Sequence, residues 1–352
     1  MGGAEKLALG LHQRYLERDH DSILLSLAGE ERGWTEKGAF SLGFSTPYNP
    51  FVVPSLLDLK DELDLCEADI LHAHLFPSQF ITAFLPEAMS LRAQLVTTEH
   101  STANRRRGTL FGRLVDRWFY KQFSGIICVS SAAASELARW IPEVSGKLEV
   151  IFNGIDLNEF SGKPPPQYND RKTVLSVGRL TEAKNYHTAI EAFSLLCTRS
   201  QFDLQYFIAG AGKLEMMLKN HAQELGVSER VRFLGEISDI PTLMKQADVF
   251  FMPSAREGFG IAAVEAMASG LPVVASRLPG LADVVGRDQH CGILVDPASP
   301  SEMSEALHCL LENDMLSWRM GSSAVKRAGT FSIEITADKY LEFYESLLKK
   351  AH

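Results

Sequence analysis

The alternation of short apolar runs with longer stretches of helical period constrains the fold of this chain more than any other feature. In the first half, the runs occupy residues 70–72, 94–97, 125–129 and 148–152. In the second half, they occupy residues 173–177, 204–209, 230–234, 249–252, 272–275 and 291–295. Runs of this length between helical segments are typical of βαβ units with a parallel sheet. We therefore predict an α/β protein built from doubly wound sheets.

A proline-rich connector separates the two series of runs. The turn dipeptide Asn153-Gly154 closes the first series, and residues 162–168 include three consecutive prolines. The length of 352 residues also favours two domains, because single cores rarely grow beyond about 250 to 300 residues. We expect an N-terminal domain over 1–152, a C-terminal domain over 153–331, and a terminal helix over 332–352 that packs back on the N-terminal domain. A cleft between the two domains is the expected ligand site.

Composition narrows the classes of function and location. The formal net charge of −9 argues against nucleic-acid binding, which depends on cations that neutralise phosphates. The five cysteines are scattered without a CxxC pair, so neither a disulfide framework nor a zinc site is expected from them. No apolar run approaches the roughly 20 residues of a membrane span, and the N-terminus lacks a signal-peptide pattern. We expect a cytoplasmic protein, soluble or peripheral on the inner face of the cytoplasmic membrane.

A glycine-rich turn before an alanine-rich helix is the most informative segment, at residues 253–260. Free amides and the helix dipole at such a turn favour a diphosphate, and Gly258 and Gly260 allow a close backbone approach. We expect Glu257 just before the helix and Glu265 about two turns inside it, one on each side of the phosphates. A carboxylate can accept two hydroxyls of a sugar or ribose. Taken alone, a glycine-rich turn before a helix is also common at helix starts that bind no ligand.

Two cations follow the strand that ends at Gly178. Arg179 and Lys184 are five residues apart, and cations placed there would stabilise the charge of a departing nucleoside diphosphate. As an isolated pair they could equally be solvated surface residues. The next strand ends in another glycine turn, at residues 209–212.

Together these segments resemble the donor domain of family 4 glycosyltransferases, which have the GT-B fold of two facing Rossmann-like domains. The resemblance rests on VGRLTEAKN, IAGAG, VRFLGEISDIPTLMKQADVFFMPS and REGFGIAAVEAMASGLPVVAS, the last with its pattern of Glu, seven residues and Glu. It covers residues 148–300 and, more loosely, the rest of the chain.

The resemblance implies a hexosyltransferase-type enzyme that retains anomeric configuration. It would move a hexosyl or N-acetylhexosaminyl group from a nucleotide-diphosphate sugar, with UDP as the expected nucleotide, to a saccharide or lipid-linked saccharide. Synthesis of cell-surface polysaccharide or lipopolysaccharide is the expected setting. No cofactor is implied, because the nucleotide sugar is a substrate. No metal is implied either, which agrees with the absence of a clustered ligand set in the sequence.

The resemblance also implies roles for matching positions. Arg179 and Lys184 would hold the diphosphate, Glu265 would bind the ribose, and Glu257 would contact hydroxyls of the transferred sugar. Backbone that would line the sugar and phosphates belongs to Gly178, Gly258, Phe259, Gly260, Ile261 and Ala262. Residues 235–237 would lie near the base.

In the N-terminal half, the resemblance assigns Gly3 to the family's first glycine loop, which approaches the donor phosphates. His74 closes one predicted strand and would approach the transferred sugar. His100 and Ser101 close another and would face the acceptor, although a lone histidine is as often structural. Relatives place a hydrophobic strand before this glycine loop, whereas Met1 directly precedes it here. We expect the first strand to be missing from the N-terminal sheet and favour a start assigned too late.

Residues 104–123 combine cations with an apolar stripe at helical spacing. The stripe comprises Leu110, Phe111, Leu114, Val115, Trp118 and Phe119, and we expect it to pack in the core. Cations such as Arg105 and Arg106 would meet a phosphate-bearing acceptor or anionic lipid headgroups.

Two other classes of function remain open at this point. A non-catalytic two-domain protein could close on a sugar or nucleotide, although periplasmic binders of this kind carry a secretion signal. A phosphorylase or nucleotide-sugar epimerase could use a similar phosphate cleft, although a phosphorylase would carry a cofactor lysine in a longer chain.

Overall fold

The computed structural model describes residues 2–29, 31–35, 38–63, 65–89, 91–102, 107, 109–160 and 170–351. It divides into two compact units. Unit 1 comprises residues 1–154 and 333–352, and unit 2 comprises residues 155–332. The chain was expected to divide at 152/153 and 331/332, and the observed units divide at 154/155 and 332/333. Residues 162–168, with the three consecutive prolines of the connector, lie outside the described residues.

Unit 1 contains two sheets. The parallel sheet has the order β4-β5-β6-β7, with strands β4 (Ile70–His74), β5 (Gln94–Glu99), β6 (Gly125–Cys128) and β7 (Leu148–Val150). The second sheet, which the apolar runs did not predict, has the order β1-β3-β2, with strands β1 (Leu24–Ala28), β2 (Arg32–Trp34) and β3 (Ala39–Phe44). The helices between the strands are α2 (Val52–Asp58), α3 (Ser78–Met89), α4 (Leu110–Lys121) and α5 (Ser131–Trp140), followed by the 3-10 helix η1 (Pro142–Lys147). The register pairs His74 with Thr98, so the carboxyl ends of β4 and β5 lie together.

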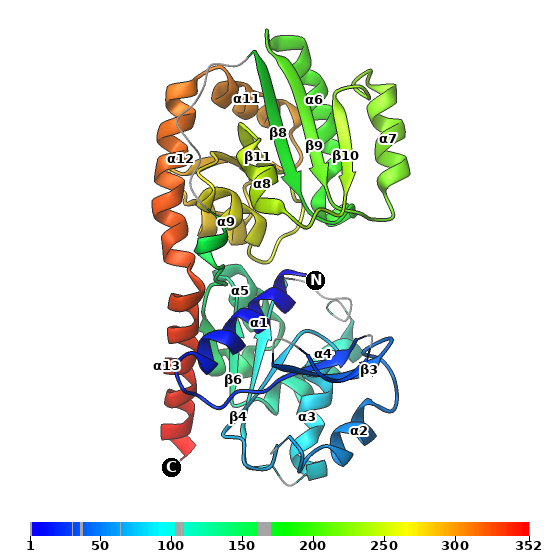
Figure 1. Cartoon of the computed structure of the whole chain (residues 1–352), viewed down its shortest axis with the longest axis vertical. Helices are drawn as coiled ribbons and strands as arrows, with labels where there is room; N and C mark the ends of the chain where they lie inside the picture. Colours follow the sequence, from blue (N-terminus) through cyan, green and yellow to red (C-terminus); the bar gives the residue numbers. More distant parts are fainter. Residues whose placement is uncertain are drawn as a thin grey trace. The chain divides into compact units, whose positions relative to one another are not determined.

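The first and last helices of the chain pack against each other in unit 1. These are α1 (Gly3–Leu16) and α13 (Ile333–Ala351), which lie side by side in Figure 1. Leu7 and Leu11 of α1 share a buried cluster with Ile333 and Tyr340 of α13. The fit is close at Gly10, where an added Cβ would lie 3.2 Å from the Ile333 side chain.

Unit 2 is built on a six-stranded parallel sheet of order β10-β9-β8-β11-β12-β13 (Figure 1). Its strands are β8 (Arg171–Val177), β9 (Asp203–Ala209), β10 (Val231–Gly235), β11 (Val249–Met252), β12 (Val273–Ser276) and β13 (Gly292–Val295). Its helices are α6 (Tyr186–Arg199), α7 (Glu215–Glu224), α8 (Ile240–Lys245), α9 (Ile261–Ala268), α10 (Pro279–Val285), α11 (Pro300–Leu311) and α12 (Asp314–Ala328). Short 3-10 helices are η2 (Leu157–Glu159), η3 (Glu182–Lys184) and η4 (Gly329–Phe331). Each apolar run predicted in the second half of the sequence forms one strand of this sheet, within two residues of the predicted bounds.

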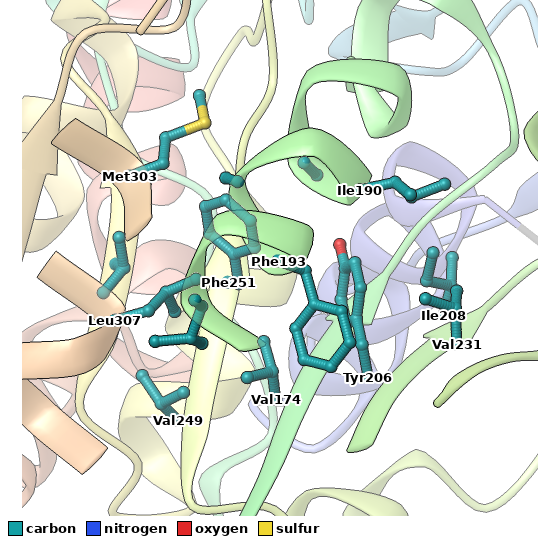
Figure 2. Close-up of a cluster of buried hydrophobic side chains, with 14 of the residues drawn as sticks. Val174, Ile190, Phe193, Tyr206, Ile208, Val231, Val249, Phe251, Met303 and Leu307 are labelled. Carbon is teal, nitrogen blue, oxygen red and sulfur yellow. The ribbon is translucent and has the colours of Figure 1, made fainter. Parts of the chain in front are cut away.

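One core supports the strands that carry the candidate site. Figure 2 shows Phe193 of α6 beside Tyr206 of β9, with Phe251 of β11 and Leu307 of α11 in the same cluster. The rings of Phe193 and Tyr206 are 5.3 Å apart, and the Tyr206 hydroxyl hydrogen-bonds Ser176 Oγ at 2.8 Å. Each such side chain contributes about 1.5 to 3 kcal/mol through burial. The strand ends above this core are therefore firmly held.

Candidate donor and acceptor sites

The strand order of unit 2 changes direction between β8 and β11. Strands β9 and β10 follow on one side of β8, whereas β12 and β13 follow on the far side of β11. Ligands of open parallel sheets bind outside the carboxyl ends of the strands at such a point. The loops there are residues 178–185 after β8 and residues 253–260 after β11. They are the two segments that the sequence singled out.

Backbone and amide contacts tie these two loops together. The Ala183 carbonyl accepts hydrogen bonds from the amides of Ala255 and Arg256 at 2.9 and 3.2 Å. Asn185 adopts a left-handed conformation (φ 56°), and its side-chain amide donates to the carbonyls of Pro253 and Pro297 at 3.1 and 2.9 Å. Asn185 therefore joins three strand-end loops. The sequence motif contained this residue, but its bridging role required the tertiary structure.

The glycines after β9 permit a close backbone approach to the loop after β8. A Cβ on Gly210 would lie 2.1 Å from the Gly178 carbonyl oxygen, and one on Gly212 would lie 2.4 Å from the Leu180 carbonyl oxygen. The Leu180 amide donates to the Ala211 carbonyl at 3.0 Å. The glycine turn therefore supports the backbone on either side of Arg179.

Lys184 and Glu257 form an ion pair between the two loops. Lys184 Nζ donates to Glu257 Oε2 at 2.6 Å, and the side chains are 23% and 17% exposed. The buried Ser254 hydroxyl donates to the same oxygen at 3.3 Å. An ammonium has three protons, and Glu257 keeps a second oxygen. The pair can therefore offer donors to an anion and an acceptor to hydroxyls at one place.

Arg179 projects from the loop after β8 and is exposed. Within the described part of the chain, no group accepts a hydrogen bond from its guanidinium. A guanidinium presents five donors in a planar fork that matches phosphate oxygens. Arg179 is therefore available to an anionic ligand.

Helix α9 begins at the other loop. Its N-cap, Gly260, has φ 101° and ψ 53°, a left-handed conformation suited to glycine, and an added Cβ would lie 2.5 Å from Leu281. Ile261 and Ala262 open the helix and are partly exposed, and first-turn amides have no intrahelical acceptor. The Phe259 side chain instead turns inward and packs on Phe331 at 5.6 Å.

Glu265 lies nearer the start of the helix than expected. Because α9 begins at Ile261, Glu265 is about one turn inside it, and the expected two turns were wrong. The error came from placing the helix start at the glycine turn. Glu265 is 8% exposed, so it is largely shielded from bulk solvent. Gly235 is the last residue of β10, and residues 236 and 237 follow it, with Ile237 exposed.

In unit 1, three histidines gather where β4 and β5 end. His74 Nδ1 lies 3.2 Å from His100 Nε2 in a hydrogen bond, and the His72 and His74 rings stack at 4.3 Å. His72 also contacts Tyr344 Oη of α13 at 2.5 Å. The sequence predicted His74 and His100 separately, and the parallel register brings them together.

Burial keeps these imidazoles neutral. It lowers the pKa of His74 to about 4 and, with the nearby His74, the pKa of His100 to about 3. Burial likewise lowers the pKa of His72 far below its ordinary value. Near neutral pH the pair therefore presents uncharged donors and acceptors.

The segment after β5 is anchored by a buried carboxylate that the sequence did not indicate. Glu99 accepts hydrogen bonds from the Tyr120 hydroxyl, from Arg107 Nη2 at 3.2 Å and from the Ser101 amide at 3.2 Å. The charge of Arg107 is thus engaged inside the unit. Ser101 itself is exposed, while Arg105 and Arg106 lie outside the described residues. Gly3 is the first residue of α1, directly after its N-cap Gly2.

Helix α4 contradicts most of the expectation that its apolar stripe packs in the core, although Phe119 of the stripe is buried as expected. Leu110, Phe111 and Leu114 are 85%, 77% and 64% exposed, and Trp118 is 41% exposed. The buried face instead carries Gly112, Asp116, Phe119 and Tyr120. Asp116 is tolerated there because it accepts a hydrogen bond from Trp140 Nε1 at 3.0 Å. Among the described helices, none is long and apolar enough to cross a bilayer.

Comparison with known proteins agrees with this geometry. The family model described as glycosyltransferase family 4 matches residues 1–159, and the model described as glycosyl transferases group 1 matches residues 158–327. The D-inositol 3-phosphate glycosyltransferase of Corynebacterium urealyticum is 29% identical over 306 residues, covering 79% of this chain and 72% of that protein. The phosphatidyl-myo-inositol mannosyltransferase of Mycobacterium leprae is 32% identical over 260 residues, covering 72% of this chain and 67% of that protein.

Solved structures show the same fold. Anabaena Alr3699/HepE in complex with UDP-glucose superposes with a TM-score of 0.82 at 22% identity, covering 98% of this chain and 96% of that one. Both units have the parallel, Rossmann-like sheets of GT-B proteins. The chain therefore belongs to glycosyltransferase family 4, has the GT-B fold and is a hexosyltransferase-type enzyme.

Proposed function

We propose that this enzyme transfers a hexosyl or N-acetylhexosaminyl group from a UDP-sugar to a phosphate-bearing, lipid-linked acceptor, with retention of anomeric configuration. The observation that carries the proposal is the grouping of Arg179, the Lys184–Glu257 pair and the α9 N-terminus at the switch point of one sheet. The UDP-glucose complex of the Anabaena protein supports uracil as the base of the donor. Phosphate-bearing inositols in the names of two relatives support an anionic acceptor.

In this proposal, the donor residues stabilise the departing diphosphate. Arg179 and Lys184 donate to its oxygens as charge develops, a contribution of about 3 to 4 kcal/mol for one such donor. The amides at Ile261 and Ala262 add donors at a helix N-terminus. Glu265 accepts the ribose hydroxyls, and Glu257 orients the sugar.

The transfer step requires no protein nucleophile. The bond between the sugar C1 and the diphosphate oxygen breaks, and the acceptor oxygen bonds to C1 on the same face. The acceptor proton passes to the departing phosphate oxygen. His74 and His100 contribute as neutral hydrogen-bonding groups at the sugar and acceptor, because their pKa values of about 4 and 3 leave them uncharged. Neither a metal nor a cofactor takes part in this step.

Thermal unfolding with UDP, GDP, ADP and dTDP tests the donor assignment. A ligand at 100 times its Kd stabilises the folded protein by about 2.7 kcal/mol. UDP should raise the midpoint of wild type and of Glu342→Ala, a control at an exposed carboxylate of α13. Glu265→Ala should lose the effect. A midpoint that no nucleotide changes, or one that UDP raises equally in Glu265→Ala, would contradict the assignment.

The exposed face of α4 supports peripheral binding to an anionic membrane, at the inner face of the cytoplasmic membrane. Leu110, Phe111 and Leu114 share this face with the exposed cation Arg113. Insertion of each large side chain would contribute about 1.5 to 3 kcal/mol, and each nearby cation about 1 kcal/mol. A lipid-linked acceptor would then be met at the surface where it is anchored.

Liposome flotation tests this part of the proposal. Vesicles of phosphatidylcholine and phosphatidylglycerol should carry the protein, whereas neutral vesicles should carry much less. Leu110→Ser combined with Phe111→Ser should reduce binding at least tenfold. The matched control is Met216→Ser with Met217→Ser, which removes two exposed apolar side chains from α7. Equal flotation of both double variants would reject α4 as the membrane contact.

A further inference from the structure

Three side chains of metal-ligand type meet where α6 packs on α7 in unit 2. His187 lies in the first turn of α6, Glu191 one turn later, and His221 in the last turn of α7. Glu191 Oε1 is 3.6 Å from His187 Nδ1 and 3.8 Å from His221 Nε2. All three ligand atoms lie within 4.8 Å of one another. The cluster is separate from the donor residues described above.

The backbone on which these side chains stand is fixed by the core. Residues four apart on a helix share one face, which places His187 above Glu191. Ile190 on α6, with Leu218 and Ala222 on α7, are buried in the cluster that joins the two helices to the sheet. The packing of α6 and α7 on the core therefore fixes the backbone positions of His187, Glu191 and His221.

His221 has the features of a metal ligand. Its side chain is 13% exposed, and its Nε2 atom is buried with no hydrogen-bond partner among the described residues. Its other nitrogen, Nδ1, lies 3.7 Å from Glu224 Oε2. Histidines that ligate metals usually donate their second N–H to a carboxylate, which fixes the ring orientation. Glu224 is placed to take that role.

We propose that His187 Nδ1, His221 Nε2 and Glu191 bind a divalent transition metal of the zinc class, with water in the remaining position. Two imidazoles and a carboxylate suit zinc better than magnesium or calcium, which prefer oxygen ligands. With bonds of about 2.1 Å, neighbouring ligands of a tetrahedral site are about 3.4 Å apart. The separations of 3.6 and 3.8 Å from Glu191 need only a small contraction, and the two imidazole nitrogens start within 4.8 Å of each other.

One ring must turn for the site to close. The His187 and His221 rings stack at 3.7 Å with planes 14° apart, so their lone pairs lie in two nearly parallel planes and do not converge on one point between the rings. His187 has the freedom to turn, because its side chain is 50% exposed. The bound metal would clamp α6 to α7. It would thereby link the helix that follows Lys184 to the helix that follows the glycine turn at Gly212, without entering the transfer chemistry.

The test is metal binding by the untagged full chain after treatment with chelator and desalting. Calorimetry with zinc should show one site, and cobalt should give the visible absorption of a low-coordinate N/O site. His187→Gln and Glu191→Gln should each weaken zinc binding by at least tenfold, and Glu224→Gln by about tenfold. His290→Asn, at an exposed histidine elsewhere in unit 2, should bind zinc as wild type does.

His187 and Glu224 are partly or largely exposed, so their variants should fold as wild type does and keep the test decisive. Zinc should also raise the unfolding midpoint of wild type more than that of His187→Gln. Absence of saturable binding by wild type, or equal affinity in His187→Gln, Glu191→Gln and wild type, would overturn the proposal.

Discussion

The Lys184–Glu257 pair is the contact whose strength bears most directly on the donor site. Its 2.6 Å separation and residual exposure of 23% and 17% place it between a surface pair and a buried pair. Surface pairs contribute about 0.2 to 1 kcal/mol, whereas breaking a buried pair costs about 3 to 5 kcal/mol. We therefore expect a coupling free energy of about 1 to 2 kcal/mol.

A double-mutant cycle measures this coupling. The variants are Lys184→Met, Glu257→Gln and their combination, each followed by urea unfolding. The free energies of unfolding should not add, and the double variant should be more stable than the sum of single losses predicts. In the transfer assay, Lys184→Met should also lower kcat by about 100-fold or more, because a donor to the diphosphate is lost. Additivity within about 0.3 kcal/mol would refute the pair as a formed contact in solution.

Three further predictions concern the glycine turn after β9, the buried His74 and the Arg107–Glu99 pair. Gly212→Ala should lower the free energy of unfolding in urea by about 1 to 3 kcal/mol, because its Cβ would lie 2.4 Å from a backbone oxygen. Gly146→Ala, with open space around it, should not lower this free energy. Similar losses in both variants would contradict the close approach. The pKa of His74 falls from 6.5 to about 4 on folding, so between these pH values the unfolded state binds more protons than the folded state. Stability that is fully present above pH 6.5 should therefore fall by up to about 3 kcal/mol as the pH is lowered toward 4. His74→Gln should flatten this dependence in acid unfolding, and an unchanged slope would contradict the shift. Arg107→Met should lower the free energy of unfolding by about 3 to 5 kcal/mol, since it leaves the Glu99 carboxylate buried without its cationic partner. A loss below about 1 kcal/mol in urea unfolding would show that the pair is not buried.

The strands of unit 2 could be predicted because each contains a short apolar run, and because β11, β12 and most of β8 are buried along their length. The β1-β3-β2 sheet of unit 1 was not predicted: β1 is only partly buried along its length and β2 is mostly exposed, although most of β3 is buried. The proximity of His74 to His100 could be expected, because the two residues end consecutive predicted strands of one parallel sheet. The connection of His72 to Tyr344 was not, because 272 residues separate them.

Helical periodicity identified the faces of α4 but not which one meets the core. The apolar stripe is the stronger signal in the sequence, yet the core face carries Asp116 and Tyr120, whose polar atoms find buried partners. A sequence pattern shows that a helix is amphipathic, but only the tertiary structure shows whether a polar atom on one face finds a hydrogen-bond partner in the core. The pairing of Arg107 with Glu99 escaped prediction for the same reason.

The donor loops were recognisable because glycine and charge stand at strand ends. Their mutual contacts were not, since the Asn185 bridge joins residues 68 and 112 positions apart. The grouping of His187 with His221 likewise depends on the packing of α6 on α7.

The central claim is sugar transfer driven by stabilisation of a departing UDP at Arg179. The direct measurement is UDP release from a panel of UDP-sugars, with and without an inositol phosphate or phosphatidylinositol acceptor, in wild type and Arg179→Ala. We expect release that depends on the acceptor and falls about 100- to 1,000-fold in the variant. Acceptor-dependent release that is undiminished in Arg179→Ala, or UDP binding without transfer from any UDP-sugar to these acceptors, would contradict it.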